Sequence, residues 1–74
     1  MQYVKYKTMD FRPLQHFLAL AETLHFGRAS DNCHVSPSTL SRTIRHLEDS
    51  LGVALFERDN RTVRLTREGN LFQQ

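Results

Sequence analysis

The chain has 74 residues, of which 39% are hydrophobic and 24% are charged. This length predicts one domain with a small core and little room for an enclosed catalytic cavity, so it favours a binding module over an enzyme. Ten Lys and Arg against eight Asp and Glu leave a formal charge of +2, which favours anionic partners only slightly.

Three further classes of protein are excluded by the sequence. The single cysteine, Cys33, cannot form an intramolecular disulfide, so a disulfide-stapled secreted scaffold is excluded. The longest strictly apolar run, residues 17–21, is far too short to span a membrane, and the N-terminal residues lack the apolar segment of a secretory signal. We therefore expect a soluble cytoplasmic module without a membrane segment.

The N-terminal third predicts a loose extension and two helices. Residues 1–8 show no sustained period and are interpreted as an extension, with a short packed strand as the alternative. A helix is expected from Asp10 as its N-cap, with Pro13 in the first turn. Its apolar stripe comprises Leu14, Phe17, Leu18, Ala21 and Leu24. After an interruption at Phe26 and Gly27, a short helix over residues 28–34 is predicted, with a small inward face of Ala29, Ser30 and Cys33.

The next segment carries the clearest helix signals. Ser36 is a good N-cap and Pro37 suits the first helical position, so a helix is predicted to begin there. Its apolar stripe comprises Leu40, Ile44, Leu47 and Leu51. Gly52 is expected as a left-handed C-cap, with Val53 making the accompanying apolar contact.

The C-terminal third predicts a β-hairpin followed by the start of a helix. Leu55 and Phe56 lead to a turn at residues 59–60, and Val63 and Leu65 alternate with a polar residue. Thr66 is expected to cap a helix that is still in progress at Gln74, which suggests a piece of a longer protein. The whole order is mainly α: three helices, a two-stranded β wing and a further helix, as in a winged helix-turn-helix.

The third helix and the hairpin carry the candidate chemistry. The outer face of the helix combines small residues, hydroxyls and arginines, which allow a helix to enter the major groove of DNA. These residues are Pro37, Ser38, Ser41, Arg42 and Arg45. The alternative to a DNA-binding face is an ordinary solvent-exposed helix surface without a binding role.

The hairpin adds a second basic cluster. Arg61, Arg64 and Arg67 lie in the hairpin and just after it, and Arg61 near the turn can reach a phosphate backbone or a narrow minor groove. The alternative for Arg61 is a salt bridge to Asp59 or Glu57. Arg58 is interpreted as structural.

No metal site, cofactor site or catalytic site is predicted. The histidines are too widely spaced for a metal signature, and Ser41 has no local base to activate it. Cys33 is interpreted as a small core residue. The histidines are His16, His25, His34 and His46.

The pattern FxxASxxCxVSxSxLSRxIxxLExxLGxxLFxRxxRxxxLTxxG over residues 26–69 resembles the N-terminal DNA-binding domain of LysR-type transcriptional regulators. The resemblance covers residues 9–74 without a gap. It implies a winged helix-turn-helix over residues 9–65 and a linker helix that starts within residues 66–74. The stretches HFGR, HVSPSTLSR and LFERDNRTV are most similar to a family member that controls branched-chain amino-acid synthesis.

The resemblance also implies roles for individual residues. The base-reading candidates are Pro37, Ser38, Ser41 and Arg42. Arg61 is implied as the wing contact, with Arg64 beside it. Thr39 and Arg45 are implied as contacts to the DNA backbone, and Ser36 as a cap that also touches phosphate.

The partners implied are double-stranded DNA with a twofold-related operator and a second copy of the chain, paired through the linker helix. A small-molecule effector would bind only a further domain absent from this sequence. For these 74 residues alone we expect a monomer or a weak dimer, because so short a linker helix is marginal in water. A winged module that docks another protein is the alternative, and an enzyme is not expected.

Three positions depart from the family pattern. Ser30 replaces a usual alanine and Cys33 a usual leucine, which predicts a less stable turn between the helices. Pro37 replaces a frequent polar base-reading residue, which shifts recognition toward apolar contact, for example with a thymine methyl.

Overall fold

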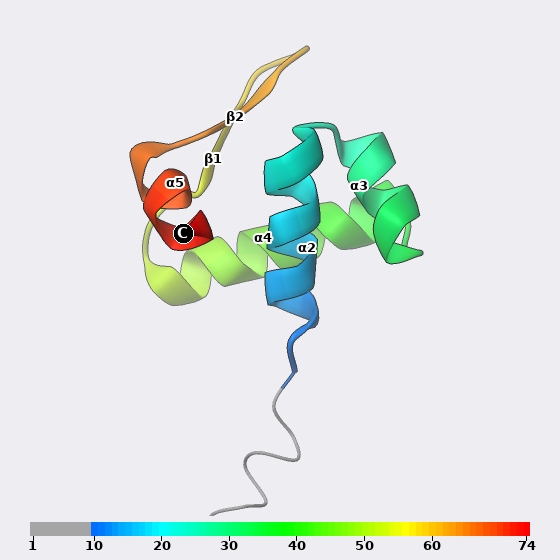
Figure 1. Cartoon of the computed structure of the whole chain (residues 1–74), viewed down its shortest axis with the longest axis horizontal. Coiled ribbons are helices and arrows are strands. Elements are labelled where there is room, and N and C mark those ends of the chain that lie inside the picture. The colour runs from blue at the N-terminus through cyan, green and yellow to red at the C-terminus, as the bar shows by residue number, and fades with distance from the viewer. Residues whose placement is uncertain (1–9) are drawn as a thin grey trace, which may run out of the picture.

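The computed structural model describes residues 10–74, so the expectation of a loose extension over residues 1–8 lies outside the described range. Residues 10–74 form four helices and a two-stranded antiparallel sheet, which confirms the predicted mainly α winged helix-turn-helix (Figure 1). The elements are α2 (Arg12–Thr23), α3 (Phe26–Cys33), α4 (Pro37–Leu51), β1 (Phe56–Arg58), β2 (Val63–Leu65) and α5 (Arg67–Gln73).

The core forms where α2 crosses α4. In Figure 1 α2 runs across α4, α3 lies at one end of α4, and α5 and the base of the hairpin lie at the other end. The Phe17 ring is fully buried, with its centroid 5.5 Å from that of Phe56 and 5.0 Å from that of Phe72. The hairpin and α5 are therefore tied to α2 through aromatic contacts. The other fully buried large apolar side chains are Leu20, Leu40, Ile44 and Leu55.

The expectations for the first helix were partly wrong. Its N-cap is Phe11, not Asp10, although an Asp10 carboxylate oxygen accepts the Arg12 backbone N–H at 3.0 Å. The predicted stripe placed Phe17 and Ala21 correctly in the core, and Leu20, which it omitted, is fully buried. Leu14, Leu18 and Leu24 are instead 41%, 36% and 40% exposed. The buried face is therefore rotated from the predicted stripe toward Leu20, which lies in one core cluster with Ala29 of α3 and with Leu40 and Ile44 of α4.

The second helix begins two residues earlier than predicted. His25 is its N-cap, and the imidazole Nδ1 accepts the Arg28 backbone N–H at 3.0 Å, so Phe26 and Gly27 form the first turn rather than a break. The buried face includes Ala29 and Ser30, as expected. The Ser30 hydroxyl donates to the Gly27 carbonyl at 2.9 Å, which satisfies its polar group in the core.

The caps of α4 are those predicted. Ser36 Oγ accepts the Thr39 backbone N–H at 3.1 Å, and Pro37 is the first helical residue. Gly52 ends the helix in the left-handed region at φ 75°, where glycine is favoured because it has no Cβ. Its N–H donates to the Glu48 carbonyl at 2.8 Å. Both ends of α4 are therefore set by local hydrogen bonds.

The hairpin and α5 also follow the prediction. The strands pair Phe56 with Leu65, Glu57 with Arg64 and Arg58 with Val63. Thr66 Oγ1 accepts the Gly69 N–H at 3.0 Å and donates to the Ala54 carbonyl at 2.7 Å. At Gly69 a Cβ would collide with the Leu55 carbonyl, so glycine lets α5 pack directly on this loop.

Candidate nucleic-acid interface

The outer face of α4 is exposed and carries two of the predicted cations. Ser38, Arg42 and Arg45 lie on the side opposite the buried Leu40 and Ile44. This spacing places the three residues on one helical face. Asp49 extends the same face, so the acid-free surface ends before the last turn.

The other predicted helix residues lie at the start or on the flanks of this face. Pro37 is exposed in the first turn, and Ser41 and Thr39 are partly buried on opposite flanks. Ser41 Oγ accepts a long hydrogen bond of 3.4 Å from the Arg58 guanidinium, so its own O–H can donate elsewhere. Ser36 Oγ donates to Thr39 Oγ1 at 2.9 Å, which commits the Ser36 proton to the turn.

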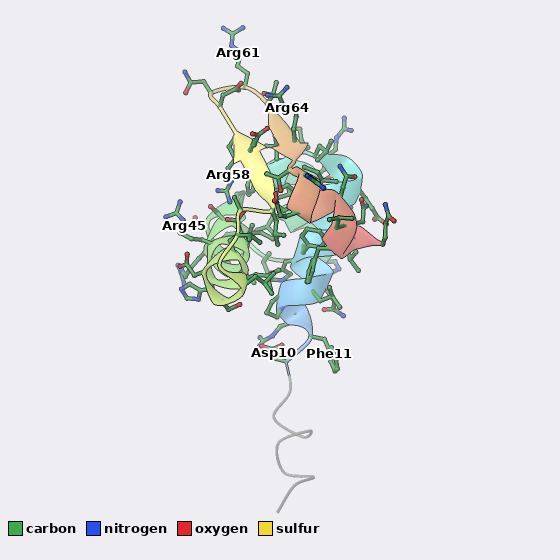
Figure 2. The ribbon with its side chains drawn as sticks, turned by 90° about the vertical axis from the view of Figure 1, so that its left-hand side faces the viewer. Asp10, Phe11, Arg45, Arg58, Arg61 and Arg64 are labelled. Atoms are coloured by element: carbon green, nitrogen blue, oxygen red, sulfur yellow. The ribbon has the colours of Figure 1, made fainter. Side chains whose placement is uncertain are left out.

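Arg61 lies at the tip of the hairpin and points away from the body of the molecule (Figure 2). The Asp59 carboxylate accepts the backbone N–H groups of Arg61 and Thr62 at 2.9 and 2.8 Å, and these bonds lower the pKa of Asp59. Among residues 10–74 the Arg61 guanidinium forms no ion pair, so the alternative salt bridge to Asp59 or Glu57 is not present. The tip arginine is thus free to meet an external anion.

Arg64 has a different setting from Arg61. It lies within β2, directly opposite Glu57 on the neighbouring strand. Opposite charges at facing positions attract each other across a sheet, which offsets part of the positive charge of Arg64. Figure 2 also shows Arg64 on the side of the hairpin away from Arg45 and α4. The structure therefore does not bring Arg64 together with the exposed face of α4.

Arg58 has the structural role predicted for it, and its partner Glu48 was missed. One Glu48 carboxylate oxygen accepts the backbone N–H groups of Leu55 and Phe56 at 2.8 and 3.1 Å. The other lies 3.6 Å from the Arg58 guanidinium, which also sits 5.0 Å from the centroid of the Phe26 ring. Glu48 thereby ties α4 to the base of the wing. Its partners lie seven or more residues away, so no local sequence signal identifies them.

A groove on the opposite flank of α4 was not predicted either. It has a volume of about 290 Å³ and lies between the start of α2 and α4. The Asp10 carboxylate receives three hydrogen bonds from the Arg12 guanidinium, two from Nε at 3.0 and 3.2 Å and one from Nη2 at 2.9 Å, and Arg12 holds the pKa of Asp10 at about 2. The groove is lined by Asp10, Arg12, Pro13, His16, Val35, Thr39, Arg42, Thr43 and His46.

The remaining chemistry-bearing residues form no site in the described part of the chain. No three His, Cys, Asp or Glu side chains come together there as possible metal ligands. Burial raises the pKa of the Cys33 thiol, which disfavours the reactive thiolate, although Cys33 is only partly buried rather than a core residue. From Asp10 to Gln74, none of the helices combines the length and apolar character needed to cross a bilayer.

Comparison with known sequences identifies the family. The sequence model described as "Bacterial regulatory helix-turn-helix protein, lysR family" matches residues 11–70. The chain belongs to the LysR family. The expectation drawn from the motif over residues 26–69 is thereby confirmed.

Two curated relatives illustrate the similarity. The HTH-type transcriptional activator IlvY of Salmonella typhimurium is 62% identical over 61 residues, which cover 82% of this chain and 21% of IlvY. The DNA-binding transcriptional dual regulator OxyR of Escherichia coli is 56% identical over 63 residues, which cover 85% of this chain and 21% of OxyR. The chain therefore spans about a fifth of the length of these transcription regulators.

Solved LysR-family structures share the fold. The DNA-binding domain of CbnR, in complex with DNA, is 40% identical with a TM-score of 0.82, and the match covers 88% of this chain and 75% of that one. The DNA-binding domain of BenM, in complex with the benA site 1 DNA, is 41% identical with a TM-score of 0.82, over 89% and 74%. The winged helix-turn-helix assignment agrees with both.

Proposed function

We propose that this chain is the sequence-specific DNA-binding domain of a LysR-family transcription regulator. The observation that carries the proposal is the exposed face of α4, where Ser38, Arg42 and Arg45 lie beside a wing whose tip arginine has no described ion-pair partner. Figure 2 shows Arg61 at the tip of the wing and Arg45 on α4 below it, each pointing away from the body of the molecule. The fold shared with two domains in complex with DNA supports the same reading.

In this proposal α4 contacts base edges in the major groove of DNA, and the wing contacts the sugar-phosphate backbone. Arg42 has the reach and the two parallel donors to bridge O6 and N7 of a guanine. Ser38 and Ser41 offer hydroxyl donors, and Pro37 offers an apolar contact for a thymine methyl. The residues proposed to contact the sugar-phosphate backbone are Ser36, Thr39, Arg45, Arg61 and Arg64. Ser36 would donate to a phosphate only after releasing Thr39 Oγ1, and Arg64 would do so from the side of the hairpin away from α4.

The test of base reading is Arg42→Ala. On a duplex that the wild-type chain selects from a random pool, we expect a loss of about 1–3 kcal/mol in binding free energy, together with a relaxed base preference. On random DNA the loss should be smaller. An equal loss on both duplexes would make Arg42 a phosphate contact and would remove the proposed base reading.

Arg61→Ala tests the wing. Because a phosphate contact is independent of sequence, binding should weaken on every duplex and the salt slope should fall by about one. An unchanged slope argues against a phosphate role for Arg61. No DNA binding at low salt, even after artificial dimerisation, would favour the alternative of a winged module that docks a protein.

We further propose that residues 9–65 form the DNA-binding unit and that residues 66–74 begin a linker helix for a homodimer on a twofold-related site. Exposed Leu71 and Phe72 on α5 supply apolar surface for such pairing. For this chain alone we expect a monomer or weak dimer in analytical ultracentrifugation. Any effector would bind outside these residues.

The proposed regulatory target is branched-chain amino-acid synthesis, as suggested by the similarity to IlvY. The 56% identity to OxyR and to a hydrogen peroxide-inducible genes activator makes a peroxide response the second candidate. Gel shifts on the region upstream of the acetohydroxy acid isomeroreductase gene, compared with regions upstream of peroxide-induced genes, distinguish the two.

A further inference from the structure

The groove between the start of α2 and α4 is lined by several hydrogen-bond donors that have no partner within residues 10–74. The Arg12 guanidinium spends Nε and one terminal nitrogen on Asp10, which leaves its second terminal nitrogen available. The Arg42 side chain makes no ion pair or hydrogen bond within the described range. Thr39 Oγ1 accepts a hydrogen bond from Ser36 and so keeps its own proton for another acceptor. Asp10 is the only carboxylate among the lining residues.

The wall formed by α2 contains an unusual polar group. His16 is only 5% exposed, and its Nδ1 has no hydrogen-bond partner among residues 10–74. Buried polar atoms are usually satisfied, so an unpartnered one beside a groove indicates that the protein keeps this place polar. With Arg12, Arg42 and His46 around it, the groove is suited to an anion rather than to an apolar ligand.

The position of the groove indicates which anion. Thr39, Thr43 and His46 lie on one flank of α4, whereas Ser41 and Glu48 on the other flank contact the wing through Arg58. A helix in the major groove lies between two sugar-phosphate backbones. In Figure 2 Arg61 at the wing tip and Asp10 at the groove lie at opposite ends of residues 10–74, with Arg45 of α4 between them.

We propose that this groove binds a phosphate of the DNA backbone on the flank of α4 opposite the wing. Arg12 is the principal donor, His46 and Thr39 assist, and the Asp10 carboxylate weakens the contact by competing for Arg12. The inference rests on the proposed DNA-binding function and adds a second backbone contact, carried by the first helix of the fold.

The test measures binding of the 74-residue chain to a labelled random-sequence duplex by fluorescence anisotropy over a range of salt concentrations. Arg12→Gln should weaken binding about tenfold at low salt and lower the salt slope by about one. Asp10→Asn should tighten binding severalfold, because an amide oxygen still accepts the Arg12 N–H while the competing charge is gone. The matched control is Arg67→Gln on α5, which removes the same charge away from α4.

The outcomes separate this inference from the proposed function. If Arg61→Ala weakens binding while Arg12→Gln behaves like Arg67→Gln, DNA binding stands and the phosphate groove is wrong. If the wild-type chain does not bind DNA, both fall. An NMR titration with inorganic phosphate checks the source of the anion. Phosphate-induced shifts at Thr39 and His46, together with an unchanged DNA salt slope in Arg12→Gln, would identify a free-phosphate site and overturn the inference.

Discussion

The two flanks of α4 are built differently. On the wing side, one Glu48 carboxylate satisfies two backbone N–H groups and faces Arg58, whose guanidinium also rests on the Phe26 ring. On the α2 side, Arg12 and Asp10 form an exposed pair, and the buried His16 has an unpartnered Nδ1.

This difference shows how one flank of α4 can be fixed to the wing while the other flank stays accessible to a ligand. The Glu48 and Arg58 side chains are only 15% and 27% exposed, so solvent and salt weaken the attraction between them less than in a fully exposed ion pair. The Arg12 and Asp10 side chains are 75% and 46% exposed, so their pair contributes little to stability and can be rearranged by a ligand. The wing side therefore sets geometry, and the α2 side stays open for contacts.

The largest expected effect is a loss of stability when the Glu48 anchor on the wing side of α4 is removed. Glu48→Ala leaves the Leu55 and Phe56 N–H groups without their acceptor and Arg58 without its carboxylate, so we expect a loss of about 3 kcal/mol in the free energy of unfolding. Urea denaturation measures this loss. The control is Glu48→Gln, which keeps an acceptor oxygen and should lose less than half as much. Equal, small losses for both variants would show that the wing is not anchored through this residue.

A smaller effect of opposite sign is expected on the open side. His16→Leu removes the unpartnered Nδ1 at similar volume, and we expect a gain of about 1 kcal/mol in the free energy of unfolding at neutral pH. Burial, and secondarily Arg12, lowers the pKa of His16, so the unfolded chain takes up a proton at a pH where the folded chain does not. The wild type should therefore lose stability as the pH falls below about 6.5, and the variant should lose less.

Urea midpoints of both proteins at pH 7.5 and 5 check this prediction. The other histidines are common to both proteins and cancel in the difference. A His16→Leu variant that is less stable than the wild type, or one with an identical pH dependence, would show that His16 is satisfied in solution.

The smallest expected effect is a local change in amide hydrogen exchange at the wing tip. Asp59→Ala removes the acceptor of the Arg61 and Thr62 N–H groups, so hydrogen exchange of these two amides should become faster while global stability changes little. Asp59→Asn, which keeps an oxygen, should retain most of the protection. Because these bonds lower the pKa of Asp59, the carboxylate's contribution is present above the unfolded value of about 3.9 and is lost as the pH falls below it. Unchanged exchange in Asp59→Ala would show that the turn does not depend on this side chain.

The features that could be predicted from the sequence depend on neighbours along the chain. The start of α4 at Ser36, its end at Gly52 and the start of α5 at Thr66 were all correct. In each case the capping bond joins residues three or four positions apart. The exposed position of Arg42 and Arg45 follows equally from helical spacing against buried Leu40 and Ile44. Most of the candidate interface could therefore be predicted without a structure.

The rest required the tertiary structure. The apolar residues of the first helix cover more than one face, and only the packing of α3 and α4 against α2 decides that Leu20 is buried while Leu14 and Leu18 are exposed. In the sequence Glu48 is an ordinary acidic residue of a helix. Only folding brings Arg58 and the start of β1 within reach of its carboxylate. The sequence by itself determined the elements, their ends and the cationic face of α4, because these depend on local bonds and helical period. The anchor at Glu48 and the groove beside Arg12 were decided only by packing between segments distant in the chain, and no spacing rule encodes that packing.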